Sequence, residues 1–377
     1  MRKKLRAVVF SFTVVSTALS ASHARAGDWP MFLKDPVHSS FAEKAPALPL
    51  TLKWRAATGG PVYSSPVVYG RRVFAGSYDN SLYAFDAGTG KLLWSFGAGG
   101  PILSTPAVSG NRVFFGSKDG YVYAVAADSG KLLWKYETGD SVLSSPVVAG
   151  GAVVVGSKDG YVYAIDAAKG TRLWRMEAYD FRRYGGIYSS PAYFAGAVFA
   201  AGKNGYIYSM NPKTGGRNWS VKTGSAIYAS PVIRDGNLYV TSFDRRLYVI
   251  DVKTGAIVWR KNLENDLAYS SPAVAPGRVY VSFKNGWIKA YDRISGRETA
   301  GFRLPDEINS TPVITAGGAL FVGCENGYLY AINPTNGEFM WQARTGGGIH
   351  ASPAVLDDAV YVGSEDGSIY AFGAGKD

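Results

Sequence analysis

The stretch SSPVVAGGAVVVGSKDGYVYAIDAAKGTRLW, residues 144–174, decides the fold of this chain. A short apolar run through Ser145-Pro146 is followed by a glycine turn and a β-rich run. The pair Asp159-Gly160, which tolerates the positive φ of a tight hairpin, separates this run from a third. A second turn ends at Gly170 and leads into a run that contains Trp174. Four short strands within about 40 residues are typical of one blade of a β-propeller.

The same unit recurs through the chain, and its Ser/Thr-Pro pair marks each copy. Successive prolines are 40, 40, 45, 40, 41, 40 and 41 residues apart. They are Pro66, Pro106, Pro146, Pro191, Pro231, Pro272, Pro312 and Pro353. No segment has helical periodicity long enough to compete. The sequence therefore predicts an all-β chain that forms a single eight-bladed β-propeller of four-stranded blades.

The two ends of the repeat region indicate how the ring closes. The last unit stops at Ile369–Phe372 with no tryptophan strand after it, whereas a spare tryptophan strand, Leu50–Trp54, precedes the first complete unit. We expect this N-terminal strand to complete the last blade, because strand edges left open invite aggregation. The expected organisation is a signal peptide at 1–26, an N-terminal arm at 27–49 and the propeller at 50–377.

One tryptophan position recurs in nearly every unit. It is occupied by Trp54, Trp94, Trp134, Trp174, Trp219, Trp259 and Trp341, and by Ala300 in the remaining unit. A large aromatic repeated at one position is expected to pack between neighbouring blades. Ala300 should then mark either a weaker junction or one that is filled from elsewhere.

The first residues predict export. A basic start that includes Arg2 and Lys3 precedes an uncharged apolar run at 7–21, and Ala24-Arg25-Ala26 matches a cleavage site. The apolar run of about 15 residues is too short for an ordinary membrane span. No cysteine lies near the cleavage site, so we expect no lipid anchor. The predicted location is the periplasm or cell envelope, with membrane association peripheral at most.

Charge and cysteine content exclude several classes of protein. The net charge of +11 falls to about +6 once the five basic residues of the signal peptide are removed. This mild excess, together with export, argues against nucleic acid as a partner. Cys324 is the single cysteine, so no intramolecular disulfide can form. We expect a monomeric propeller that is stabilised by its core.

The repeated features carry a family resemblance. The tryptophan strand, the Ser-Ser-Pro run, the Asp/Asn-Gly turn and endings such as Tyr163–Gly170 resemble the pyrroloquinoline-quinone-like propeller repeat, over residues 27–377. The start Trp29–Phe32 also looks like the N-terminal arm of such proteins. One branch consists of quinone-dependent dehydrogenases, which the resemblance associates with adjacent cysteines and a calcium ion. The other consists of non-catalytic envelope scaffolds of the BamB type, which assemble outer-membrane proteins.

Two features point to a protein partner. The loops between the second and third strands should share one face, and in units two to six they contain Lys118, Lys158, Lys203, Arg245 with Arg246, and Lys284. Units seven and eight contain Glu325 and Glu365 instead. Such charges either solvate the surface or orient an acidic partner. The longest interval contains Phe181, Arg182, Arg183 and Tyr184, residue types that anchor interfaces but could equally pack on the propeller itself.

A third set of residues should lie near the mouth of the central axis, three positions before each proline. It comprises Tyr63, Leu103, Leu143, Tyr188, Tyr228, Tyr269, Asn309 and His350. The tyrosines, Asn309 and His350 could bind a small ligand or simply fill the centre. The spacing places no carboxylate beside His350, so no catalytic residue is predicted. No metal site is predicted either, because the Asp-x-x-x-Gly endings do not match a calcium loop.

The sequence therefore favours an exported, non-catalytic propeller scaffold that binds an envelope protein and needs no cofactor. Two alternatives stay open. One is a quinone-dependent dehydrogenase, which would use pyrroloquinoline quinone with calcium. The other is a propeller that binds a small ligand or a polysaccharide at the mouth of its axis.

Overall fold

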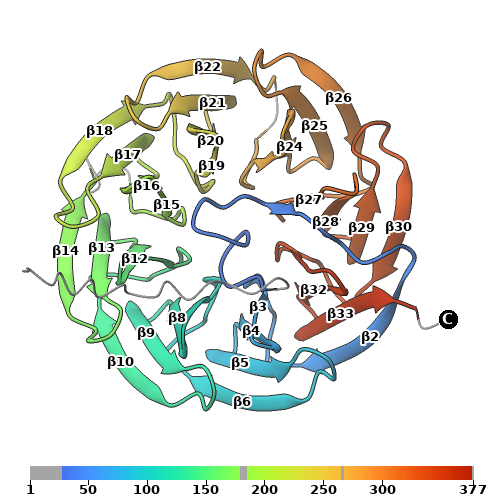
Figure 1. Cartoon of the computed structure of the whole chain (residues 1–377), viewed down its shortest axis with the longest axis horizontal. Coiled ribbons are helices and arrows are strands. Elements are labelled where there is room, and N and C mark those ends of the chain that lie inside the picture. The colour runs from blue at the N-terminus through green and yellow to red at the C-terminus, as the bar shows by residue number, and fades with distance from the viewer. Residues whose placement is uncertain (1–27, 179–184, 265–266, 376–377) are drawn as a thin grey trace, which may run out of the picture.

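The computed structural model describes residues 28–178, 185–264 and 267–375. These residues form eight β-sheets arranged as blades around one axis (Figure 1). Every blade contains four antiparallel strands, which run in sequence order from the axis outward in seven blades and end on β2 in the eighth, and this confirms the predicted eight-bladed propeller. The sheet of blade 7 also takes up the short strand β1 as a fifth member. None of the described segments forms a helix long and apolar enough to cross a membrane. The predicted signal peptide lies outside the described residues.

The strands repeat with nearly constant bounds. The innermost strands are β3 (Val67–Tyr69), β7 (Ala107–Ser109), β11 (Val147–Ala149), β15 (Ala192–Phe194), β19 (Val232–Arg234), β23 (Ala273–Val274), β27 (Val313–Thr315) and β31 (Ala354–Val355). The second strands are β4 (Arg72–Gly76), β8 (Arg112–Gly116), β12 (Ala152–Gly156), β16 (Ala197–Ala201), β20 (Asn237–Ser242), β24 (Arg278–Ser282), β28 (Leu320–Gly323) and β32 (Ala359–Ser364).

The outer half of each blade follows the same order. The third strands are β5 (Ser81–Asp86), β9 (Tyr121–Ala126), β13 (Tyr161–Asp166), β17 (Tyr206–Met210), β21 (Arg246–Asp251), β25 (Trp287–Asp292), β29 (Tyr328–Ile332) and β33 (Ser368–Ala374). The outermost strands are β6 (Leu92–Gly97), β10 (Leu132–Glu137), β14 (Arg172–Glu177), β18 (Arg217–Lys222), β22 (Ile257–Asn262), β26 (Glu298–Arg303), β30 (Phe339–Arg344) and β2 (Leu50–Ala57).

The ring closes as the sequence predicts. Strand β2 pairs antiparallel with β33, which places Trp54 opposite Ala371 and Ala57 opposite Ser368. Blade 8 is thus built from both ends of the propeller, and the third strand of that blade is no longer an open edge.

The Ser/Thr-Pro pairs form a closed ring of hydrogen bonds around the axis, which we call the hydroxyl ring. In each blade, the amide N–H of the residue before proline donates to the side-chain hydroxyl of its counterpart in the next blade. The donor–acceptor pairs are Ser65–Thr105, Thr105–Ser145, Ser145–Ser190, Ser190–Ser230, Ser230–Ser271, Ser271–Thr311, Thr311–Ser352 and Ser352–Ser65, at 2.8–3.2 Å. The ring therefore requires a hydroxyl at this position in every blade.

The tryptophans hold the outer parts of adjacent blades together, as expected. Trp174, for example, is 6% exposed, and its Nε1–H donates to the Pro212 carbonyl at 2.8 Å. The indole packs so closely on Gly215 that a Cβ there would lie 2.6 Å from it. At the junction with Ala300 the equivalent glycine, Gly337, packs on Phe302 instead. That junction is thus filled by a different side chain.

The N-terminal arm crosses the axis of the ring before it reaches β2 (Figure 1). Its backbone bonds to Val68, Val108, Tyr193, Ile233 and Ile314, residues of five different inner strands. Strand β1 (Phe41–Ala42) pairs parallel with β27. These contacts lie where the inner strands end, on the face opposite the second-to-third loops. The arm thus covers one end of the axis and leaves the other end to those loops.

Candidate functional site

Two concentric sets of side chains meet on the face that carries the second-to-third loops. The inner set, called the mouth ring, comprises Tyr63, Leu103, Leu143, Tyr188, Tyr228, Tyr269, Asn309 and His350. The outer set, called the loop ring, takes one residue from the start of each second-to-third loop. It comprises Tyr78, Lys118, Lys158, Lys203, Phe243, Lys284, Glu325 and Glu365. All of these residues are at least partly exposed.

The two rings interdigitate with a fixed offset. Phe243 lies 4.7 Å, between ring centroids, from Tyr228 of its own blade and 4.7 Å from Tyr269 of the next. Glu325 likewise contacts Asn309 of its own blade and His350 of the next. Each loop-ring residue can therefore bridge two neighbouring mouth-ring residues.

The part of the loop ring that contains Lys118, Lys158, Lys203 and Lys284 is called the basic sector, and three of its lysines lie beside tyrosine rings. Lys203 Nζ lies 5.9 Å from the centroid of Tyr188, and Lys284 Nζ lies 6.0 Å from that of Tyr269. Lys118 lies over Tyr78 at 5.2 Å. A cation within about 6 Å of an aromatic face is attracted by the ring quadrupole. The lysines are thus positioned beside flat aromatic surfaces on this face.

The other predicted partner residues are placed differently. Phe243 occupies the lysine position in blade 5, so the basic series is interrupted there by an aromatic side chain. Arg245 lies in the turn and Arg246 begins β21, 4.0 Å from Asp244. Lys158 packs beneath the crossover into blade 4, because a Cβ on Gly186 would lie 2.3 Å from its Cα. The predicted contacts of Phe181, Arg182, Arg183 and Tyr184 fall outside the described residues.

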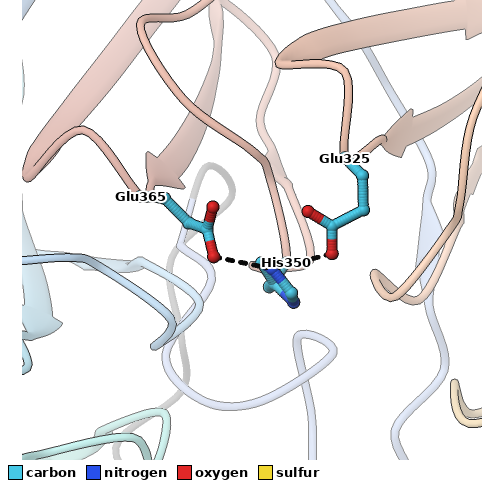
Figure 2. Close-up of side chains that lie close together, drawn as sticks. All are labelled: Glu325, His350 and Glu365. Carbon is cyan, nitrogen blue, oxygen red and sulfur yellow. Dashed lines mark ion pairs between the residues drawn. The ribbon is translucent and has the colours of Figure 1, made fainter.

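The acidic sector brings three side chains together at the junction of blades 7 and 8 (Figure 2). His350 Nε2 lies 2.9 Å from Glu325 Oε1 and 3.0 Å from Glu365 Oε1. Asn309 Nδ2 donates to Glu325 Oε1 at 2.5 Å, and the Tyr63 ring packs edge-on against the imidazole at 5.1 Å. Burial, followed by a hydrogen bond to Glu365, raises the pKa of Tyr63.

Sequence reasoning missed this cluster, although it named each member. Glu325 and Glu365 belong to the loop ring, whereas His350 belongs to the mouth ring. The spacing within either ring places no carboxylate beside His350. The offset between the rings places Glu325 and Glu365 on either side of it. Aligning the loops at the small residue that precedes each loop-ring position, Cys324 and Ser364 here, would have supplied the missing signal.

The comparisons with known proteins agree with this architecture. The model of the family described as outer membrane protein assembly factor BamB matches residues 51–105, 97–219, 158–300 and 284–376. No curated protein sequence matches the chain. BamB from Moraxella catarrhalis is similar at 20% identity with a TM-score of 0.76, and the match covers 86% of this chain and 100% of that one.

Two enzymes of known structure share the fold. The quinohemoprotein alcohol dehydrogenase of Comamonas testosteroni is 16% identical, with a TM-score of 0.82 over 94% of this chain and 82% of that one. A europium-containing methanol dehydrogenase is 17% identical, with a TM-score of 0.81 over 92% and 98% of the two chains. At such identities the likeness to solved structures shows the fold alone. The family model, which matches nearly all of the ring, shows that this chain belongs to the BamB family of outer membrane protein assembly factors.

Proposed function

We propose that this protein is a non-catalytic scaffold of the cell envelope, and that it binds an acidic protein segment through the face formed by the mouth and loop rings. The observation that carries the proposal is the basic sector, in which Lys118, Lys203 and Lys284 lie over tyrosine rings on one face. Cationic and aromatic side chains together are typical of interface anchors. Membership of an assembly-factor family supports this reading.

The geometry of the arm supports the choice of face. At the opposite end of the axis, inner-strand backbone groups of five blades are already bonded to the arm. The loop face instead presents partly exposed side chains, with a basic sector and an acidic one. This separation of charge would orient a partner whose own charges are complementary.

The residues do not fit the quinone-and-calcium chemistry of the dehydrogenase alternative. The adjacent cysteines that the resemblance associates with the quinone are lacking, since the chain has one cysteine. The carboxylates of the acidic sector converge on an imidazole, which is a poor ligand for calcium. We therefore derive no catalytic step for this protein.

The aromatic part of the mouth ring favours a second candidate, a small ligand or a polysaccharide. Tyr188 packs on Tyr228 at 5.5 Å, and Phe243 joins Tyr228 to Tyr269. Such a row of rings could stack on sugar faces. Binding of envelope glycans that is lost in Tyr228→Ala but kept in the lysine variant below would favour this candidate over a protein partner.

Charge reversal on the two faces tests the scaffold proposal. The triple variant Lys118→Glu, Lys203→Glu and Lys284→Glu should lose the envelope proteins that co-purify with the wild-type chain, as identified by mass spectrometry. The matched control reverses Lys91, Lys131 and Lys253, three exposed lysines in turns on the opposite face, and should retain them. Equal retention by both variants would refute the proposed face. Turnover of alcohols with added quinone and calcium would refute the non-catalytic assignment.

A further inference from the structure

The acidic sector gathers three side chains of the types that bind metal ions. Zinc ligands lie about 2.0–2.2 Å from the ion. Two ligand atoms are therefore about 2.9–3.5 Å apart when the angle between them at the ion is between a right angle and the tetrahedral angle. His350 Nε2 is 2.9 Å and 3.0 Å from its two carboxylate oxygens, within this range. One donor atom from each of Glu325, His350 and Glu365 lies within 4.8 Å of the others. We propose that these three residues bind a divalent transition-metal ion, with Zn²⁺ as the representative ligand.

The surroundings of His350 Nε2 favour binding of a metal ion by this nitrogen. This atom is buried and has no hydrogen-bond partner of acceptable geometry, although two carboxylate oxygens are within 3.0 Å. Since the distances are short enough, the angles must fail: neither oxygen lies along the direction of the ring N–H. A simple histidine–carboxylate pair would instead align one oxygen with that bond. Because both oxygens lie to the side of this direction, an ion can bind along the lone pair of Nε2.

The surrounding groups orient the carboxylates as outer-shell partners do in metal sites. Asn309 donates to Glu325, and the Tyr63 ring packs edge-on against the imidazole of His350. Gly348 lies directly behind both acids: a Cβ there would be 2.6 Å from Glu325 Oε2 and 2.9 Å from Glu365 Oε2. A side chain at this position would therefore push both carboxylates out of their present places beside the imidazole.

The donor set selects the class of ion. One imidazole with two carboxylates suits zinc and its first-row neighbours, whereas calcium and magnesium take oxygen ligands. The side chains of His350, Glu325 and Glu365 are 26%, 23% and 36% exposed. Three protein ligands at a partly exposed position leave coordination sites for water or for a donor from a bound molecule. This inference does not depend on the scaffold proposal.

Calorimetric titration of the tag-free chain 27–377, stripped of metal and titrated with ZnCl₂, tests the site directly. We expect one ion per chain, with affinity reduced at least about 100-fold in Glu365→Gln and His350→Phe, and reduced about tenfold in Asn309→Ala, which removes the donor to Glu325. His38→Gln is the matched control, because His38 is the other histidine of this chain segment, and it should bind like the wild type. The Co²⁺-loaded wild type should also show visible d–d absorption that His350→Phe lacks.

The proposal has clear contrary outcomes. Absence of zinc binding, or equal binding by the wild type and His350→Phe, would refute it and leave the cluster as an ion pair. Displacement of zinc by equimolar CaCl₂ would also refute it, because the imidazole would then not be a ligand. Thermal unfolding separates lost binding from misfolding. Zinc should raise the melting temperature of the wild type but not that of Glu365→Gln, while the two metal-free proteins should unfold at the same temperature.

Discussion

Replacing Ser145 by alanine should test whether the hydroxyl ring holds the blades together. The Ser145 hydroxyl accepts the Thr105 amide N–H at 2.9 Å, and Thr105 is 3% exposed. Alanine removes the acceptor and leaves the amide buried without a partner, which costs about 1–3 kcal/mol. Very little apolar contact is lost, since the change removes one oxygen atom. We therefore expect the free energy of unfolding to fall by about 1–3 kcal/mol.

The matched control is Ser145→Thr, because threonine already occupies this position in blades 2 and 7 as Thr105 and Thr311. It keeps the hydroxyl acceptor and should therefore cost less stability than the alanine variant. Urea unfolding followed by tryptophan fluorescence measures both variants. The double variant Ser145→Ala with Ser230→Ala removes acceptors for two different donors, so its cost should be about the sum of the single changes. An alanine variant as stable as the threonine variant would refute the structural role of the ring.

Two further predictions concern other buried contacts. Trp174→Phe should lower the free energy of unfolding by about 2–3 kcal/mol, since it leaves the Pro212 carbonyl unpaired and opens a gap above Gly215. Trp287 is half-buried, so Trp287→Phe should cost less in the same urea experiment. Equal losses in the two variants would contradict the role of Trp174 at the blade junction. Burial lowers the pKa of His38 to about 4, although its bond to the Pro231 carbonyl opposes this. The unfolded chain then takes up the proton first, so stability present above pH 6.5 is lost as the pH falls toward 4, by about 2 kcal/mol at pH 5. His38→Gln should lose that much less between pH 7.5 and 5, and an unchanged pH dependence would show that His38 is not the group responsible.

The repeat made most of the fold predictable. Each Ser/Thr-Pro pair, Asp/Asn-Gly turn and tryptophan strand specifies local structure, and eight copies at near-constant spacing leave one architecture. The spare strand 50–54 even indicated which blade the N-terminus completes. The path of the arm across the axis could not be predicted in this way, because residues 28–49 occur once and their bonds go to five separate blades.

The functional face was only partly predictable. Position counting identified the mouth ring and most of the loop ring, but it treated Arg245 as equivalent to the lysines, whereas Phe243 holds that place between two tyrosines. Charge alone also could not show that the lysines lie over aromatic rings. Those contacts depend on the directions of side chains that come from different loops and, for Lys118 and Tyr78, from different blades.

By itself, the sequence determined the number of blades, their strand order and the closure of the ring, because these follow from local patterns repeated at a fixed interval. Only the tertiary structure decided which side chains of different blades meet. Glu325, His350 and Glu365 come together because the ring turns each blade against the next, so that a loop of one blade lies beside the inner strand of its neighbour. That relation depends on the geometry between repeats, which no single repeat encodes.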